Sequence, residues 1–592
     1  MHCFLQVFCA VFSGLLLALA IPNELYKLGS PVIGLLSLAP LYLSVTRAKD
    51  YNEAFRVCAL QALVCHLTSS YWLAFFQGFA IFTLGASALG TAGYHGLFGL
   101  LYFWLYSKQR GEQALMVRAG RREGAEPLRV LWFASLYTVW EWCKSNGFLG
   151  YPWGTVSMTA FRVPLITQIA DVTGSYGVTF LFVFFAASLA EGVELLATLP
   201  TAMTPRRLVA SWRSTFATSL ALLALALCYG AVELLLPRAP VKTLNAVLVQ
   251  QNLDPWLGGE KRAISISERL TDDAVATFAA RGIRPDVVVW SEAVLNKGLP
   301  DATNHYTVFP NERPLIPFIR ETALPFIIGG RLTMNEEKNQ YGNAALLFGS
   351  DGVQKGAYVK LHLVPFAERI PGVQYDWVRT LMKRVIGFSY GWTQGYKAVL
   401  FDLPLATPPH YDAERTHIVS LTGEKQERQT TALVGTPICF DDAFGEVCRR
   451  LFLAGSEVFL NLTNDSWSRT DSAELQHFVV ASYRAIEYRT TLARATNAGF
   501  TCVVSPTGKV LQSLALFTEG ALATQIPVYE RRLTIYARLG DWLPKTLALL
   551  ATAFLCVVLL REHDDRTEIA TAWTAMLGVW FQTIADMGVW DY

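Results

Sequence analysis

The sequence predicts a bundle of about eight membrane-spanning helices joined to an extramembrane α/β domain. Hydrophobic residues make up 52 % of the 592-residue chain and charged residues only 17 %, against about 25 % charge in soluble domains. Mean hydropathy is +0.30. Long apolar runs occupy both ends of the chain, whereas charges and turn residues return between residues 237 and 542. These observations exclude a disordered chain, which needs low hydrophobicity and high net charge.

The predicted spans are apolar runs, because a helix needs about 20 such residues to cross a bilayer. The run at 3–21 lacks a preceding basic segment and is followed by further runs, so we expect a retained helix rather than a signal peptide. The boundaries predict seven spans within 1–236, the α/β domain at 237–542, an eighth span at 543–560 and a tail at 561–592. The eight runs lie near 3–21, 29–46, 56–76, 79–106, 129–146, 166–198, 215–236 and 543–560.

Basic residues predict the orientation of these spans. Lys and Arg concentrate in the loops at 47–55, 107–128 and 199–214. Alternating spans place all three loops on one side, and Lys/Arg-rich loops stay in the cytoplasm. We therefore expect both termini in the cytoplasm and the α/β domain on the opposite side of the membrane.

The segment 237–542 alternates strand and helix patterns, which indicates a layered α/β domain. Helical spacing of apolar residues predicts helices at 260–281 and 473–496, and GSDG and SPTGK predict hairpin turns. The polar stretch 404–431 is expected to be an exposed insertion. The predicted strands are β-branched and aromatic-rich stretches within 244–253, 285–295, 325–333, 342–350, 353–363, 431–440, 456–465 and 501–514.

Several function classes lack their sequence marks. The net charge of +2 gives no basic field for nucleic acid. Most of the 10 cysteines lie in apolar stretches and no CxxC pair occurs, so no disulfide framework is predicted. HExxH, Walker and GxGxxG motifs are absent, so we expect no metal, nucleotide or other cofactor.

Three segments of the α/β domain hold residues suited to catalysis. VVVWSEAV carries Glu292 at the end of an apolar strand, YVKLHLVPFAERIP carries Lys360 and Glu368, and GTPICFDDAFGE carries Cys439. Taken singly, each has an ordinary structural interpretation: a cap or ion pair for the glutamate, a solvated face for the lysine, and inert packing for the cysteine. Together they provide a base, a cation and a nucleophile, which suffice for acyl transfer through a thioester.

The position of Cys439 favours the catalytic interpretation. It stands between a strand and the expected helix beginning DDAFGE. The backbone N–H groups of a helix start can stabilise a thiolate and lower its pKa. The same N–H groups can hold an oxyanion.

The order Glu–Lys–Cys, with each residue at a strand end, resembles the nitrilase superfamily of carbon–nitrogen hydrolases. The eight spans, with the α/β domain inserted before the last, resemble more narrowly the apolipoprotein N-acyltransferase family. This resemblance implies a four-layer α-β-β-α sandwich in the α/β domain. The phrases that carry it are YPWG at 151–154, HLVPFAERIP at 362–371, NDSW at 464–467, QHF at 476–478, RATNAGFT at 494–501 and ARLGDW at 537–542.

The resemblance implies a role for each residue of the set. Cys439 would take a fatty acyl group from a phospholipid as a thioester, and Glu292 would be the general base and later the acid. Lys360 would stabilise the oxyanion. Glu368 matches a second glutamate of the family, which would position Lys360 or relay protons.

Further residues match the family without a settled role. Phe440 and Asp441 match the two residues that follow the nucleophile, although the family usually has Glu where this chain has Asp441. Asn464 and Trp467 either shape the back of the site or serve packing and turn formation. The insertion 404–431 and the tail 561–592 extend beyond the pattern common to the family. The tail is expected to be either an amphipathic helix on the membrane surface or a poorly ordered segment.

A lipid substrate needs a route to the thiol, and the aromatic and basic segment 373–397 suggests one. Its aromatic side chains suit the membrane interface, so we expect a lid over a lipid-facing entrance; the alternative is an ordinary surface loop. The expected lid residues are Trp377, Phe388, Tyr390 and Trp392.

The reaction implied by the resemblance is lipoprotein N-acylation at a bacterial inner membrane, with the α/β domain in the periplasm. The acyl donor would be phosphatidylethanolamine, and the acceptor the N-terminal amine of diacylglyceryl-cysteine in apolipoproteins. One alternative is a membrane-tethered amidase that uses water as acceptor. A transporter with an inert domain is a second alternative, but charged residues cluster near predicted span ends rather than deep within the spans.

Overall fold

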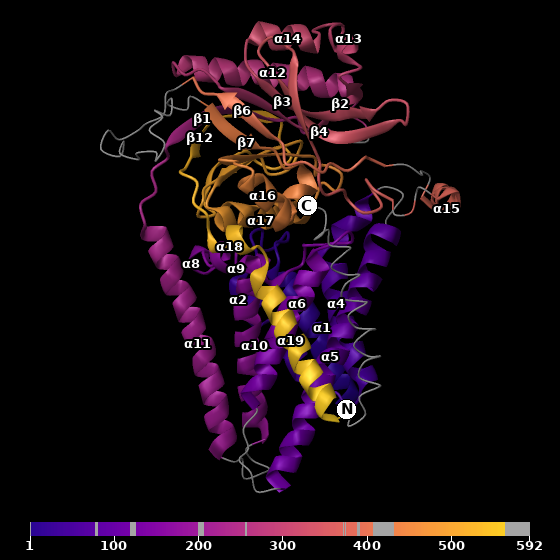
Figure 1. Ribbon diagram of the computed structural model, residues 1–592, viewed down its shortest axis with the longest axis vertical. Coiled ribbons are helices and arrows are strands. Elements are labelled where there is room, and N and C mark those ends of the chain that lie inside the picture. The colour runs from indigo at the N-terminus through magenta and orange to yellow at the C-terminus, as the bar shows by residue number, and fades with distance from the viewer. Residues whose placement is uncertain are drawn as a thin grey trace. The chain divides into compact units, whose positions relative to one another are not determined.

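The computed structural model contains two compact units. One comprises Met1–Ala74, Phe79–Ala231 and Asp541–Tyr592, and the other comprises Phe75–Gly78 and Val232–Gly540. We call them the helical unit and the α/β unit (Figure 1). The structure describes residues 2–76, 81–118, 126–198, 206–254, 257, 259–370, 372, 375–386, 391–406 and 431–562.

The helical unit consists of long apolar helices and short connecting turns. The α4 helix begins after Asp50, whose carboxylate accepts a hydrogen bond from the Glu53 N–H at 2.8 Å. The short helices α7 (Val156–Thr159), α8 (Pro164–Thr167) and α9 (Ala170–Thr173) precede α10. The other helices are α1 (His2–Ala20), α2 (Pro31–Leu36), α3 (Ala39–Thr46), α4 (Tyr51–Ser69), α5 (Ser87–Arg118), α6 (Glu126–Ser145), α10 (Ser175–Thr198), α11 (Arg206–Leu235, whose last turn belongs to the α/β unit) and α19 (Trp542–Glu562).

Each predicted span coincides with helix, but fewer helices qualify as spans. Within the described residues, two helical segments are long and apolar enough to cross a membrane, Ser175–Leu195 and Trp212–Leu235. Three shorter apolar helices are Phe4–Ala20, Pro31–Thr46 and Trp542–Cys556. The predicted count of eight spans is therefore not confirmed by helix length and composition.

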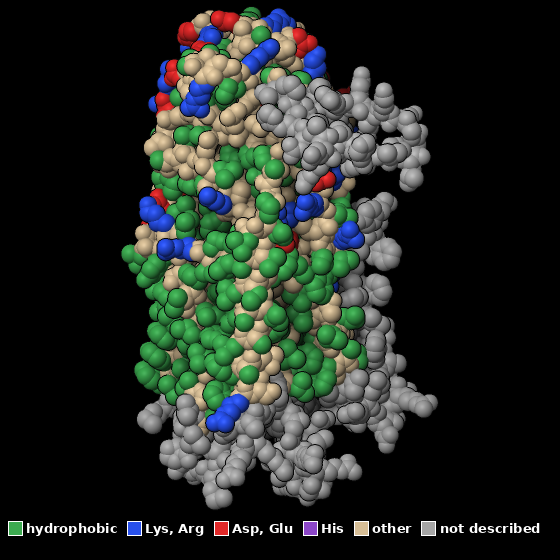
Figure 2. Space-filling view, turned by 90° about the vertical axis from the view of Figure 1, so that its left-hand side faces the viewer, with side chains coloured by type: hydrophobic (Ala, Val, Ile, Leu, Met, Phe, Trp, Pro, Cys, Tyr) green, Lys and Arg blue, Asp and Glu red, His purple; other side chains and the backbone are tan. Residues whose placement is uncertain are grey.

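The surface of the helical unit is strongly apolar. Figure 2 shows hydrophobic side chains gathered over the helices on the face it presents. Exposed examples are Phe4 and Phe8 on α1, Leu225 on α11, and Leu549 and Leu550 on α19. Apolar surface this extensive is rare on soluble monomers and marks contact with lipid or protein.

The α/β unit contains two six-stranded sheets, with strand orders β12-β1-β2-β3-β4-β5 and β11-β10-β9-β8-β7-β6. The strands β1, β2 and β3 run parallel, as do β7, β8 and β9, while the outer strands are antiparallel. The strands are β1 (Lys242–Gln250), β2 (Val287–Leu299), β3 (Phe326–Asn335), β4 (Gln340–Phe348), β5 (Gln354–Val359), β6 (Leu400–Pro404), β7 (Thr431–Gly435), β8 (Val458–Thr463), β9 (Thr491–Thr496), β10 (Cys502–Val504), β11 (Val510–Ser513) and β12 (Gly520–Val528).

The sheets face each other between two layers of helices. Strands β1, β2 and β12 of the first sheet contact β8 or β9 of the second, α12 packs on the first sheet, and α17 contacts β9. Every residue of β8 and β9 is buried, as expected for strands covered on both faces. Figure 1 shows this α-β-β-α layering. The helices are α12 (Glu260–Ala280), α13 (Thr303–Tyr306), α14 (Leu315–Thr322), α15 (Asp376–Ile386), α16 (Gly445–Leu453), α17 (Asp471–Tyr488) and α18 (Ile535–Leu539).

One predicted helix is wrong in its last third. The pattern at 473–496 predicted a continuous helix, but α17 ends at Tyr488 and residues 491–496 form strand β9. Arg489 adopts the left-handed conformation, with φ of 49°, and ends the helix. The β-branched residues Thr490 and Thr491 follow and favour extended backbone. The strand that results lies in the middle of the second sheet.

Candidate active site

Two carboxylates and one ammonium group form a buried cluster in the α/β unit. The Lys360 Nζ lies 3.2 Å from Glu292 Oε1 and 3.0 Å from Glu368 Oε1. Asn343 Nδ2 donates hydrogen bonds to the same two oxygens, at 2.7 and 3.1 Å. Burial lowers the pKa of Lys360, but Glu292 and Glu368 outweigh this effect and hold that pKa well above its ordinary value. The cluster therefore keeps a cation at neutral pH.

Strand β2 presents Glu292 through a local break in its pairing. The register with β3 shifts after Trp290, and Ala293 adopts a φ of 60°. Glycine is needed on the neighbouring strand, since a Cβ at Gly329 would lie 2.5 Å from the Glu292 Cα. The irregularity turns a glutamate out of a buried strand toward the cluster.

The surroundings of Glu292 suit a general base. Its Oε2 accepts a hydrogen bond from the Asn464 N–H at 2.9 Å. Burial raises the pKa of Glu292, the Lys360 ammonium lowers it and Glu368 raises it, and the net pKa lies above its ordinary value. A carboxylate with a raised pKa accepts a proton more readily near neutral pH.

Cys439 stands on a strained turn after β7. Its φ is 45°, an uncommon conformation for a residue with a side chain, and a 3₁₀ turn spans Cys439–Ala443. Burial and the negative charge of Glu292 raise the pKa of the thiol well above its ordinary value, although Lys360 lowers it. The prediction of a lowered thiol pKa is wrong, because burial raises the pKa most and Glu292 and Asp465 raise it further, while α16 begins only at Gly445. At neutral pH Cys439 is therefore a neutral thiol, which would need a base in order to act as a nucleophile.

Asp441 joins the turn at Cys439 to the chain on either side of Lys360. Its Oδ2 accepts hydrogen bonds from the Tyr358 hydroxyl at 2.8 Å and from the Ile438 N–H at 3.2 Å. Its Oδ1 accepts one from the His362 N–H at 2.7 Å. Burial raises its pKa to about 6, although Lys360 and these donors lower it. The shorter aspartate side chain thus reaches backbone partners on both sides of the site.

A buried charge network lies beside Cys439, and the sequence predicted no role for it. Asp465 Oδ1 lies 3.9 Å from the Cys439 Sγ and 2.8 Å from the His477 Nδ1. The His477 Nε2 lies 2.9 Å from Asp442 Oδ1, and the Arg494 guanidinium pairs with Asp442. Asp465, His477 and Arg494 stand in the phrases NDSW, QHF and RATNAGFT, and Asp442 stands in GTPICFDDAFGE, so these four residues had a sequence signal. Asn343 had none.

Three of these groups have the spacing of a metal site. The Cys439 sulfur, an Asp465 oxygen and a His477 nitrogen lie within 4.8 Å of one another. Both ring nitrogens of His477 face carboxylates, however, and burial of the ring is outweighed by Asp465 and Asp442, which raise its pKa to about 9. An imidazolium offers no lone pair to a metal. We therefore interpret the group as a hydrogen-bonded charge network.

The protonation of His477 gives a test of this interpretation. Its pKa is raised from 6.5 to about 9, so its stabilising contribution is complete below pH 6.5 and is lost as pH rises through about 9. That shift corresponds to roughly 3 kcal/mol. We expect His477→Gln to destabilise the full chain most at pH 6 and progressively less toward pH 9, measured by thermal unfolding in micelles. His305→Gln, on α13, should retain the pH dependence of the original chain, and a pH-independent effect of His477→Gln would refute the assignment.

The remaining predicted residues fall into three positions. Asn464 holds Glu292 through its backbone N–H and accepts a hydrogen bond from the Asn497 Nδ2 at 3.1 Å. The Phe440 ring packs against His362, with ring centroids 5.5 Å apart. The Trp467 ring packs against Phe76, with centroids 5.4 Å apart.

The expected lid is only partly described. Trp377 lies on α15 with 69 % of its surface exposed. Trp392 is half-buried. Its ring centroid lies 5.3 Å from the Arg331 guanidinium carbon, and its backbone N–H donates a hydrogen bond to the Glu368 carbonyl at 2.8 Å. Phe388 and Tyr390, most of the insertion 404–431 and nearly all of the tail 561–592 lie outside the described residues.

Comparison with known proteins gives matches to both parts of the chain. Residues 13–188 match the model of the apolipoprotein N-acyltransferase N-terminal domain, and residues 254–536 match the carbon-nitrogen hydrolase model. Apolipoprotein N-acyltransferase 2 of Treponema denticola is 36 % identical over 92 % of this chain and 96 % of its own. The protein of the same name from Treponema pallidum is 36 % identical over 95 % and 97 %.

Comparison with solved structures also gives matches. The crystal structure of a carbon-nitrogen hydrolase from Helicobacter pylori G27 is 16 % identical, with a TM-score of 0.32. The match covers 48 % of this chain and 89 % of that one.

Proposed function

The chain belongs to the apolipoprotein N-acyltransferase family, and on that premise we propose that Cys439, Glu292 and Lys360 form its catalytic triad. Its activity is lipoprotein N-acylation. The observation that carries the assignment of the triad is electrostatic. The buried Lys360 ammonium group is held between two carboxylates, and its charge lowers the otherwise raised pKa of the neutral Cys439 thiol in the same unit. This arrangement supplies a nucleophile, a base and a fixed positive charge.

The first half-step forms the thioester. The Cys439 sulfur attacks the carbonyl carbon of a phospholipid ester while Glu292 accepts the thiol proton. The Lys360 ammonium stabilises the oxyanion of the tetrahedral intermediate. When the carbon–oxygen bond breaks, Glu292 returns the proton to the departing glycerol oxygen. The products are the acylated enzyme and a lysophospholipid.

The second half-step forms the amide. The neutral N-terminal amine of diacylglyceryl-cysteine attacks the thioester carbonyl, and Glu292 accepts a proton from the nitrogen. The carbon–sulfur bond breaks, and the proton goes to the Cys439 sulfur. The triad ends as it began. Because a protonated amine cannot attack, transfer should weaken at low pH.

Glu368 positions the lysine rather than reacting. Its carboxylate contacts the Lys360 ammonium, and its Oε2 accepts a hydrogen bond from the Val364 N–H at 2.8 Å. This ties the lysine to the loop that carries Glu368. The second carboxylate also keeps Lys360 charged when Glu292 takes up a proton.

The chain is a membrane enzyme, and we assign it eight spans with the α/β unit in the periplasm of the bacterial inner membrane. Helix occurs at each of the eight predicted runs, and three Lys/Arg-rich loops share one side in that arrangement. An impermeant maleimide should label Asp351→Cys, in the exposed turn between β4 and β5, in intact spheroplasts. Labelling only after lysis would contradict the orientation.

The donor and the acceptor follow from the same assignment. We assign phosphatidylethanolamine as the donor and diacylated apolipoproteins as acceptors. Purified enzyme, incubated with this lipid and a diacylglyceryl-cysteine peptide, should add one acyl chain to the peptide, as read by mass spectrometry. The same peptide with a blocked amine should gain none. Release of free fatty acid without peptide acylation would instead favour the amidase alternative.

Helix α15 supports a role in lipid entry. It carries Trp377 and Leu381 exposed on one side, with Arg379, Lys383 and Arg384 in the same helix. An aromatic and basic helix of this kind suits a membrane interface. Phe388, Tyr390 and Trp392 follow it in the chain and extend the proposed lid.

Charging the exposed tryptophan tests this role. We expect Trp377→Asp to lower turnover of vesicle phospholipid about tenfold or more, because the interfacial aromatic contact is lost. Alkylation of Cys439 by iodoacetamide should change less than about twofold. Trp377→Phe is the matched control and should retain lipid turnover. Equal turnover in Trp377→Asp and Trp377→Phe would contradict the lid.

A further inference from the structure

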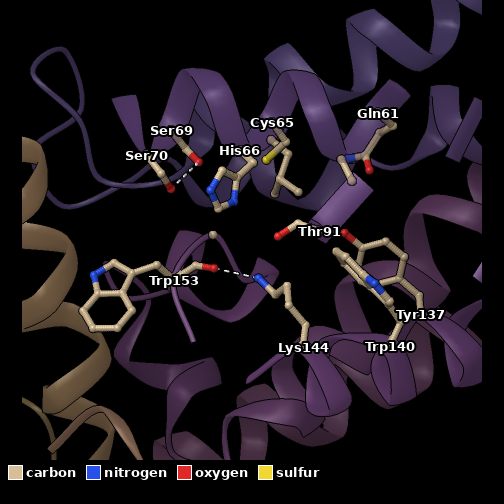
Figure 3. A pocket seen from close by; sticks show the side chains of 13 residues that line it. Gln61, Cys65, His66, Ser69, Ser70, Thr91, Tyr137, Trp140, Lys144 and Trp153 are labelled. Atoms are coloured by element: carbon tan, nitrogen blue, oxygen red, sulfur yellow. Dashed lines mark hydrogen bonds between the residues drawn. The ribbon is translucent and has the colours of Figure 1, made fainter. Parts of the chain in front are cut away.

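The helical unit contains a polar pocket that shares no residue with the triad. Helices α4, α5 and α6 and the chain at 153–154 line it. Figure 3 shows the side chains around it, with Lys144 and His66 directed toward its centre. Its polar lining includes Gln61, His66, Ser69, Ser70, Tyr137 and Lys144.

Lys144 brings a positive charge into this pocket without a direct counter-ion. The residue is 8 % exposed, and its Nζ donates a hydrogen bond to the Trp153 carbonyl at 2.6 Å. Among the described residues, no carboxylate lies within 4.0 Å of this ammonium. The neighbouring Glu141 is occupied elsewhere, because its two oxygens accept hydrogen bonds from the Val156 N–H and the Thr179 hydroxyl. The Trp140 ring lies 5.5 Å from the Lys144 Nζ and gives a cation–π contact, but it supplies no counter-charge. A buried charge without a counter-ion is costly.

Further donors around the pocket also lack partners within the described part of the chain. The amide of Gln61 is 1 % exposed, and neither its nitrogen nor its oxygen has a hydrogen-bond partner. The buried Tyr137 hydroxyl is likewise unpaired. Buried polar groups are normally satisfied, so an ammonium with unused N–H groups, an amide and a hydroxyl around one space indicate a ligand.

We propose that this pocket binds a phosphate-type oxyanion. The ammonium supplies the compensating charge, and donors on three helices suit an anion that accepts hydrogen bonds from several directions. Lysine is a common point-charge partner of phosphate. The oxyanion is either the phosphodiester of a lipid headgroup or free phosphate. The inference does not rest on the proposed catalytic function.

The test is ligand-dependent thermal stability of the full chain in phosphate-free micelles. The probes are inorganic phosphate, dihexanoyl-phosphatidylglycerol and the phosphate-free dihexanoylglycerol. A ligand that binds only the folded state raises Tm. At least one phosphate-bearing probe should raise it, whereas dihexanoylglycerol should not. A response to the phospholipid alone identifies the headgroup as the ligand, and a response to both identifies any accessible phosphate.

Variants locate the binding. Lys144→Met should raise the half-saturating concentration about tenfold or more, the loss expected for a charge-assisted hydrogen bond. Lys49→Met, an equal change at an exposed residue of the same unit, should not. If Lys144→Met fails to fold, Gln61→Leu replaces it, with an expected rise of about threefold. No Tm response to either phosphate-bearing probe, an equal response to dihexanoylglycerol, or unchanged half-saturation in the folded pocket variants would overturn the proposal.

Discussion

Lys360→Met is expected to reduce acyl transfer about 100- to 1,000-fold. The ammonium group is the only positive charge that the described structure places within 4.0 Å of Glu292 and Glu368. Removing it deletes the proposed oxyanion partner, a loss of roughly 100- to 1,000-fold in comparable sites. It also leaves two buried carboxylates unpaired, which costs about 3–5 kcal/mol. The measurement is the rate of peptide acylation per folded protein.

Lys355→Met is the matched control for that substitution. It lies on β5, the strand that directly precedes Lys360, where its side chain is 48 % exposed and pairs with Asp351 at 2.6 Å. Exposed ion pairs contribute little to stability. We expect activity within about twofold of the original chain. Retention of more than a tenth of the activity in folded Lys360→Met would show that the lysine is not the oxyanion partner.

Glu292→Gln is expected to slow thioester formation about 100- to 10,000-fold, the range of general-base contributions. Glutamine keeps the size of the side chain but cannot accept the thiol proton. Lys360 remains paired with Glu368, so the variant should fold. The measurement is rapid-quench accumulation of acyl-enzyme.

The pH dependence separates a base from a purely structural glutamate. Since the pKa of Glu292 is raised and the base must be ionised, thioester formation should increase as pH rises through that pKa. Glu292→Gln should lose this rise, whereas Glu336→Gln, in the exposed turn after β3, should keep it. A pH profile in Glu292→Gln parallel to that of the original chain would contradict the assignment.

The architecture of the α/β unit could be predicted from sequence because its central strands are strongly patterned. Most of the predicted strands correspond to observed ones, and helix 260–281 matches α12. The strands β6, β9 and β12 were missed. The short strand β6 lies beside a long polar insertion. The residues of β9 continue the apolar spacing of α17, so the spacing does not reveal that the left-handed Arg489 ends the helix before them. A single residue's conformation decided that boundary.

The sequence indicates residues for the candidate site but does not indicate their electrostatics. Their positions at strand ends and the family resemblance indicated Glu292, Lys360 and Cys439. The pKa of Cys439, however, depends on burial and on Glu292 across the site, which local sequence does not reveal. The charge network at His477 arises from contacts such as His477 to Asp442, 35 residues apart in the chain.

The most direct test of the account is intact-mass analysis of the purified chain after incubation with phosphatidylethanolamine. We predict a mass gain of one fatty acyl group that hydroxylamine removes. Cys439→Ala should abolish it, whereas Cys448→Ala, at a buried cysteine on α16, should retain it. A folded chain that gains no acyl group, or an adduct that persists in Cys439→Ala, would contradict a thioester on Cys439 and with it the proposed mechanism.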